Sequence, residues 1–225
     1  MKKGLTEVVF ILDRSGSMSG LEADTIGGFN SMINKQKQEE GEAYISTVLF
    51  DDQTEVLHDR VPVGKIEPMN DKQYYVRGCT ALLDAIGGAI HHIGNVHKYA
   101  REEDRPEKTI FIITTDGMEN ASHFYTYDKI KKMVERQKNK FAWEFIFLGA
   151  NIDAIEVAGR FGIAANRAVN YEADREGTAL NFEVLSKTVS NFRGCALEDE
   201  DMDMLIEGSL NLVREDYKKR HKGRR

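Results

Sequence analysis

The chain has 225 residues, of which 41% are hydrophobic and 30% are charged, with three prolines and a net charge of -6. These values fit one ordered, soluble domain and exclude disordered and fibrous proteins. The longest apolar run near the N-terminus, VVFIL, is too short for a signal peptide or a membrane span, so we expect a cytoplasmic protein.

Short apolar runs alternate along the chain with segments of helical spacing. Four runs rich in β-branched and aromatic residues predict buried strands: TEVVFIL (6–12), AYISTVLF (43–50), KTIFIIT (108–114) and WEFIFLG (143–149). Apolar residues at helical spacing predict helices that begin near Leu21, Leu82 and Ile130. Ser19 and Glu22 have the spacing of a capping box for the first of these helices. This alternation predicts a parallel sheet that is covered by helices on both faces.

One strand and the C-terminal third depart from this simple alternation. The run TEVLH (54–58) follows the second strand after only DDQ, which predicts an antiparallel hairpin at the edge of the sheet. After the fourth buried strand we expect four elements: a short helix near 152–160, a weak strand at 167–171, an amphipathic helix over 180–192 and a last helix near 202–217. We interpret the acidic run 197–203 as the start of that helix, because it lacks the glycine and glutamate of a calcium loop.

The predicted fold class is therefore α/β, a doubly wound and mostly parallel six-stranded sheet of order 3-2-1-4-5-6 with one antiparallel edge strand. We expect a single domain over residues 1–213, followed by a basic tail over 214–225. The tail holds seven Lys/Arg and two acidic residues, and the remaining 24 basic and 35 acidic residues leave the body at -11. An acidic body makes broad nucleic-acid binding an unfavoured interpretation.

The segment VFILDRSGSMSG (9–20) ends an apolar strand with an aspartate and alternating serines. It has neither the lysine of a phosphate-binding P-loop nor the glycine spacing of a dinucleotide site. Two interpretations remain, an ordinary turn between a strand and a helix, and a metal site. Asp13, Ser15 and Ser17 fall at alternate positions, which a turn does not require. Mg²⁺ prefers oxygen ligands in octahedral geometry, so further ligands would have to come from other strand ends.

Two later segments supply such ligands. Asp116 follows the apolar run IFIITT, and Thr80 precedes the helix that begins near Leu82. Each has an ordinary alternative, since Asp116 and Gly117 form a common turn pair and Thr80 is a good helix N-cap. Together they favour a site, because the carboxyl ends of the first and fourth strands of a doubly wound sheet are adjacent and form its usual ligand crevice.

The D-x-S-x-S motif at Asp13, Ser15 and Ser17, with a threonine in GCTALLDAI and an aspartate in TTDG, resembles the von Willebrand factor A domain and its metal-ion-dependent adhesion site. The resemblance covers roughly residues 5–193 and agrees with the predicted order of elements. It implies that Ser15, Ser17 and Thr80 give hydroxyl ligands to Mg²⁺ or Mn²⁺, and that Asp13 and Asp116 act directly or through water. The chain is similar to compact, stand-alone bacterial or phage members, including those associated with tellurium resistance.

By this resemblance, the expected function is non-enzymatic binding of a protein partner that offers a Glu or Asp carboxylate to the metal. The alternative is a metal-assisted hydrolase or phosphoryl-transfer enzyme, which would need a base near the site. His123 is the most plausible base, although none of the histidines has a recognisable spacing. A third possibility is a structural or self-assembling subunit in which the metal serves as a staple. The sequence does not predict the oligomeric state.

Overall fold

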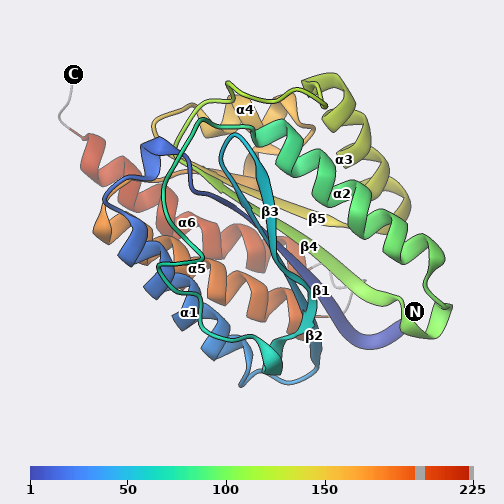
Figure 1. Ribbon diagram of the computed structural model, residues 1–225. Coiled ribbons are helices and arrows are strands. Elements are labelled where there is room, and N and C mark those ends of the chain that lie inside the picture. Colours follow the sequence, from blue (N-terminus) through green and yellow to red (C-terminus); the bar gives the residue numbers. More distant parts are fainter. Residues whose placement is uncertain (196–200, 223–225) are drawn as a thin grey trace.

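The computed structural model describes residues 1–195 and 201–222, and its centre is one six-stranded sheet of order β3-β2-β1-β4-β5-β6 (Figure 1). The strands are β1 (Lys2–Asp13), β2 (Glu42–Phe50), β3 (Thr54–Pro62), β4 (Pro106–Thr115), β5 (Glu144–Gly149) and β6 (Ala168–Asn170). All neighbouring pairs are parallel except β2 with β3, which is antiparallel. The predicted fold class, strand order and edge hairpin are thus confirmed.

Six α-helices in the described residues cover the two faces of the sheet: α1 (Glu22–Gln36), α2 (Leu82–Tyr99), α3 (Tyr127–Phe141), α4 (Ala154–Arg160), α5 (Arg175–Gly194) and α6 (Asp201–His221). Helices α1, α5 and α6 lie on one face, and α2, α3 and α4 lie on the other (Figure 1). Successive residues of β1 divide between the two cores, since Phe10 packs toward α1 and α5 while Ile11 packs toward α2. Both faces of the central strand are therefore buried, as its continuous apolar run predicts.

The start of α1 differs from the sequence prediction. Ser19 does not cap this helix: it ends a short 3₁₀ turn over Gly16–Met18, and Leu21 occupies the N-cap position without a side-chain hydrogen bond. Glu22 instead accepts a hydrogen bond from the backbone N–H of Gly20. The predicted capping box is wrong because the extra turn moves the helix start beyond the reach of Ser19.

The C-terminal helix is longer than the sequence prediction. Helix α6 continues to His221, so most of the segment expected as a basic tail is helical. Two of its arginines are anchored: Arg220 pairs with Asp174, and Arg214 donates to the backbone carbonyl of Asn166. Part of the acidic run 197–203 lies outside the described residues, and the part from Asp201 onward forms the first turn of α6. None of the helices in the described part of the chain has the length and apolarity that crossing a bilayer requires.

The sheet brings the ends of β1 and β4 together. Leu12 is paired with Thr114 in the parallel register, so Asp13 and Asp116 leave the sheet at the same edge. Strand β2 ends beside them, since Asp13 is paired with Phe50. The strand order reverses at this point, which makes it the expected position for a ligand site in a doubly wound fold.

Candidate metal centre

All five side chains predicted as metal ligands meet at this edge of the sheet. The hydroxyl of Thr80 donates to that of Ser15 at 3.1 Å, and the hydroxyls of Ser15 and Ser17 are 3.1 Å apart. Ser17 in turn donates to the carboxylate of Asp116. Asp13 joins the group through its Oδ1, which accepts from the backbone N–H of Ser15 at 2.7 Å. The structure therefore gathers three hydroxyls and two carboxylates from three separate segments into one connected cluster.

Asp13 is held rigidly at the end of β1. Its side chain is 1% exposed, and its second oxygen, Oδ2, accepts from the hydroxyl of Thr115 at 2.5 Å. The hydroxyl of Tyr74 donates to the backbone carbonyl of Asp13 at 2.5 Å. Burial raises the pKa of Asp13, and the hydrogen bonds from Ser15 and Thr115 act against that rise.

Only one of the two carboxylate oxygens of Asp116 has a hydrogen-bond partner among the described residues. Asp116 is 2% exposed, its Oδ1 accepts from Ser17, and its Oδ2 is buried without a hydrogen-bond partner among the described residues. Burial, with a smaller contribution from the negative charge of Asp13, raises the pKa of Asp116 to about 6 against the opposing effect of the hydrogen bond from Ser17. A buried carboxylate oxygen without a partner is costly unless a cation or a donor approaches it.

The donor set fits a hard divalent cation. In the described part of the chain, no Lys, Arg or His side chain forms an ion pair with Asp13 or Asp116, so their charges have no protein cation. Carboxylate and hydroxyl oxygens are ligands that Mg²⁺ and Mn²⁺ accept, whereas soft metals prefer sulfur and imidazole. The described residues contain no group of three or more His, Cys, Asp or Glu side chains placed for a metal. The fit therefore depends on the three hydroxyls together with the two carboxylates.

Gly117 leaves room for the cluster. A Cβ atom at this position would lie 3.1 Å from Ser17 Oγ and 3.2 Å from Thr80 Oγ1, so any larger residue would press against two of the candidate ligands. The side chain of Ser17 is exposed while the other four candidate ligands are buried. The cluster therefore opens to the surface on the side of Ser17.

The Thr80 segment is held by a residue that sequence reasoning missed. Asn120 accepts from the backbone N–H of Thr80 through its Oδ1 at 2.9 Å and donates its own backbone N–H to the Thr80 carbonyl at 3.0 Å. Thr80 itself is not the cap of α2, because Ala81 occupies the N-cap position. The competing interpretation of Thr80 as a helix cap is therefore wrong, and its hydroxyl is directed to Ser15 instead.

Arg14 is the second residue that sequence reasoning missed. It lies between two candidate ligands and is fully buried, and its guanidinium pairs with Asp51 and Glu55 at 2.8 Å each. The sequence did contain a signal, since a charged residue directly after a buried strand requires a partner if it stays inside. Its partners, Asp51 and Glu55, could not be identified before the hairpin was placed.

The histidines do not join the cluster through any hydrogen bond in the described structure. His97 and His92 contact Glu7 and Asp59, and His58 contacts Thr47. His123 follows Asp116 in the next loop, and its backbone N–H donates to Asp84. None of these contacts places an imidazole as a base beside the five oxygens.

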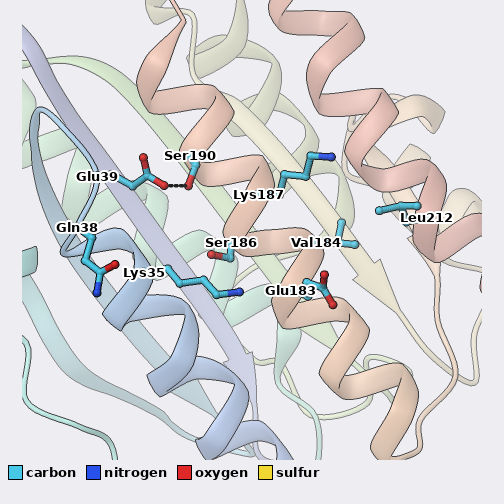
Figure 2. Close-up of a pocket in the computed structure, with 9 residues that line it drawn as sticks. All are labelled: Lys35, Gln38, Glu39, Glu183, Val184, Ser186, Lys187, Ser190 and Leu212. Carbon is cyan, nitrogen blue, oxygen red and sulfur yellow. Dashed lines mark hydrogen bonds between the residues drawn. The ribbon is translucent and has the colours of Figure 1, made fainter.

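A groove lies elsewhere, on the face covered by α1, α5 and α6. It has a volume of about 590 Å³ and is lined by residues of α1 and α5 and of the segment that follows α1, with Leu212 of α6 at its edge (Figure 2). Its lining mixes lysines, glutamates and serines. The groove and the five-oxygen cluster share no residue.

Comparison with known proteins adds information at the level of the fold. No protein-family model and no curated protein sequence matches the chain. The vWF domain of the type V pili tip protein Mfa5 from Porphyromonas gingivalis matches with a TM-score of 0.59 and 12% identity, covering 87% of this chain and 98% of that one. Manganese-loaded TRAP protein from Plasmodium vivax matches with a TM-score of 0.54 and 15% identity, covering 81% and 74%.

A third match is proximal thread matrix protein 1 from the mussel byssus, in a structure with a zinc-occupied MIDAS motif. Its TM-score is 0.55 and its identity 13%, with 82% of this chain covered. The chain spans 46% of the length of that protein. Identities this low show a common fold and leave the ligand and the activity open. The chain therefore has the fold of a von Willebrand factor A domain.

Proposed function

We propose that the protein is a non-enzymatic binding module that uses Mg²⁺ or Mn²⁺ to grip an acidic residue of a protein partner. Asp13, Ser15, Ser17, Thr80 and Asp116 would hold the metal. The observation that carries the proposal is the pair of buried carboxylates without a protein cation, joined to three hydroxyls at a surface opening. Two of the solved structures with this fold are described as manganese-loaded and as having a zinc-occupied MIDAS motif, which supports a divalent cation here.

The donor set favours binding because three of its five side chains are neutral hydroxyls. When bound, the metal would supply a positive charge that only Asp13 and Asp116 offset, and a carboxylate from a partner could complete its oxygen shell. The chain's own residues fix the cluster: Tyr74 and Thr115 hold Asp13, and Asn120 holds Thr80. The exposed side chain of Ser17 marks the direction from which a partner would approach.

A hydrolase or phosphoryl-transfer activity has no specific observation in its favour. Such a reaction needs a general base or a nucleophile within hydrogen-bond reach of the reacting atom. The side chains of His97, His92 and His58 contact Glu7, Asp59 and Thr47, and no histidine side chain in the described residues forms a hydrogen bond with a candidate ligand. We therefore propose recognition as the function.

The test is a pull-down from an extract of the native cells with the purified protein as bait, once in Mg²⁺ and once in EDTA. The expected result is a partner that is retained only with Mg²⁺ and is lost with Asp13→Ala and with the double variant Ser15→Ala/Ser17→Ala. Ser19→Ala is the matched control, because Ser19 is exposed in the same loop and its hydroxyl makes no hydrogen bond in the described structure. A partner that binds equally well in EDTA and to the Asp13→Ala variant would contradict the proposal.

A further inference from the structure

We propose that Arg14 is a positioning residue for the candidate metal centre, and that it acts through Asp51 to fix the segment that carries Thr80. The inference rests on the proposed metal site, and it assigns a role to residues that are not themselves candidate ligands. Its consequence is that the affinity for the metal depends on residues that do not contact the metal. These residues are Arg14, Asp51, Glu55 and Arg77, and we call them the ion cluster.

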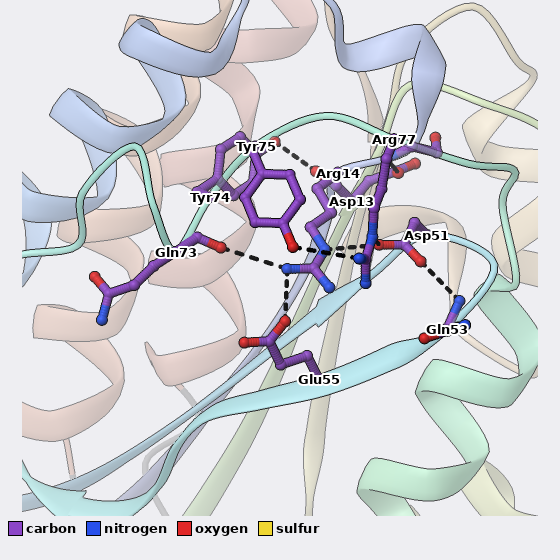
Figure 3. Close-up of polar contacts among 10 residues, drawn as sticks. Asp13, Arg14, Asp51, Gln53, Glu55, Gln73, Tyr74, Tyr75 and Arg77 are labelled. Carbon is purple, nitrogen blue, oxygen red and sulfur yellow. Dashed lines mark hydrogen bonds and ion pairs between the residues drawn. The ribbon is translucent and has the colours of Figure 1, made fainter.

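Arg14 points away from the ligands on either side of it. Its side chain extends toward the hairpin of β2 and β3, where Nε donates to Asp51 Oδ2 at 2.8 Å and Nη1 pairs with Glu55 Oε2 at 2.8 Å (Figure 3). Nη1 also donates to the backbone carbonyl of Gln73 at 3.4 Å. The guanidinium and Asp51 are both fully buried, so the contact between them is shielded from solvent and from salt. One side chain therefore joins the ligand loop to two other segments, the β2–β3 hairpin and the segment of Gln73.

Asp51 connects Arg14 to the segment 77–81. Its Oδ2 accepts from both Arg14 Nε and Arg77 Nε at 2.8 Å (Figure 3). Its backbone carbonyl accepts from the N–H of Ala81 at 2.8 Å. Arg77 and Ala81 flank Thr80 on both sides. Asp51 thus holds both ends of the short segment in which Thr80 lies.

Two backbone hydrogen bonds join the same segment directly to the ligand loop. The N–H of Arg77 donates to the carbonyl of Arg14 at 3.0 Å, and the N–H of Gly16 donates to the carbonyl of Gly78 at 3.1 Å. Gly78 has a φ of +66°, and a Cβ there would lie 2.1 Å from Asp52 Oδ1, so this close approach requires glycine. The two segments are therefore in contact along their length, with Thr80 following the last of these contacts.

Thr80 needs this support more than the other ligands do. Asp13 ends β1 and Asp116 directly follows β4, so the sheet itself fixes them. Thr80 follows residues 66–79, which form no helix or strand, and its position depends on side-chain and backbone anchors. The cluster supplies these anchors at little net charge, because Arg14 and Arg77 face Asp51 and Glu55. It can hold Thr80 in place without repelling a cation at the neighbouring site.

The experiment measures Mn²⁺ affinity by titration calorimetry on the full chain, together with the melting temperature of the metal-free protein. The test variant is Arg14→Lys, because lysine keeps the charge but cannot direct several fixed donors to Asp51, Glu55 and Gln73 at once. We expect the Kd for Mn²⁺ to rise by about 10-fold or more, the usual range for residues that orient metal ligands. The control is Glu7→Gln, which lies six residues before Asp13 in β1 and disturbs a buried ion pair between β1 and Arg60 of β3. It should lower the melting temperature and leave the Kd unchanged.

A double-variant cycle with Thr80→Ala tests whether Arg14 acts through Thr80. If it does, Arg14→Lys weakens binding far less in the Thr80→Ala background than in the wild type, because the residue that it positions is gone. Additive effects would contradict the inference, as would an Arg14→Lys variant with the wild-type Kd or a Glu7→Gln variant that weakens binding equally. If Arg14→Lys does not fold, Arg77→Gln takes its place, with the same expected direction and an unchanged Kd as the contradicting result. A wild type that binds no Mn²⁺ contradicts the proposed function itself.

Discussion

Two groups of buried carboxylates lie side by side at the carboxyl edge of the sheet. Asp51 is paired with arginines, whereas Asp13 and Asp116 are not paired with any cation of the described residues. Asp51 is fully buried, and its oxygens meet Arg14, Arg77 and a backbone N–H. Burial acts to raise the pKa of Asp51, but the hydrogen bonds from Arg77, Gln53 and Arg14 outweigh it, and the pKa is lowered.

The second group lacks such cations. Asp13 and Asp116 are almost as deeply buried, yet burial raises the pKa of both, and of Asp116 to about 6. The contrast shows that burial alone does not decide the charge state of these groups. The charge nearby decides it, and at Asp13 and Asp116 the described chain supplies none. A divalent cation would compensate the negative charge of Asp13 and Asp116, as the guanidinium groups of Arg14 and Arg77 compensate that of Asp51.

The largest expected effect on stability belongs to the ion cluster. Asp51→Asn removes the carboxylate and leaves the buried Arg14 without its main partner, so we expect a loss of about 3–5 kcal/mol in the free energy of unfolding. Urea denaturation of the metal-free protein measures it. A change below about 1 kcal/mol, the usual size for an exposed ion pair, would show that the cluster is not an effective anchor.

An Asp-to-Asn substitution at Asp116 should have the opposite effect on the free energy of unfolding. Asp116→Asn removes a buried charge that has no cation, so the metal-free protein should gain stability, on the order of 1–3 kcal/mol at pH 7 from the raised pKa. Addition of Mg²⁺ should stabilise the wild type and have no effect on this variant. Denaturation with and without Mg²⁺ gives both results, and a metal-free Asp116→Asn variant that is less stable than wild type would contradict the comparison.

The dependence on pH follows from the same carboxylate. Because the folded-state pKa of Asp116 is raised to about 6, above its ordinary value of 3.8, the folded state binds its proton more tightly than the unfolded state does. The contribution of Asp116 to the stability of the metal-free protein should therefore rise as pH falls from about 7 to 5. Denaturation curves for wild type and Asp116→Asn across this pH range isolate that contribution. A difference in their free energies of unfolding that does not change with pH would contradict the raised pKa of Asp116.

The smallest effect is expected at the exposed side of the ion cluster. Glu55 contacts Arg14, but its side chain is 47% exposed, and Arg14 keeps its bond to Asp51 when Glu55 is changed. Glu55→Gln should cost about 1 kcal/mol or less. Measured at low and high NaCl, this cost should shrink with salt while that of Asp51→Asn does not, because Asp51 is fully buried.

The sequence was sufficient for the fold and for the five residues of the cluster. Asp13 and Asp116 each follow a long apolar run, and parallel strands place such residues at one edge, so their proximity needed only the strand order. The supporting residues could not be predicted in this way. Asp51 reads as part of an ordinary hairpin turn, and only the placed hairpin shows that it faces Arg14 and Arg77.

The helix-cap interpretations of Ser19 and Thr80 were wrong because other contacts use these residues. Ser19 has the spacing of a helix cap, but the 3₁₀ turn over Gly16–Met18 uses it as its last residue. Thr80 has the chemistry of a cap, but the hydroxyl of Ser15 is its partner instead. In both cases a tertiary or turn contact outweighed a short-range preference of the kind on which capping predictions depend.

The most direct test of the account is a Mn²⁺ titration of the metal-free wild type followed by electron paramagnetic resonance, which distinguishes free from bound Mn²⁺. The account predicts one bound ion per chain, retained in Ser19→Ala and lost in Asp116→Asn. A wild type that leaves all Mn²⁺ free, or an Asp116→Asn variant that still binds one ion with wild-type affinity, would contradict the claim that these five side chains form a metal centre.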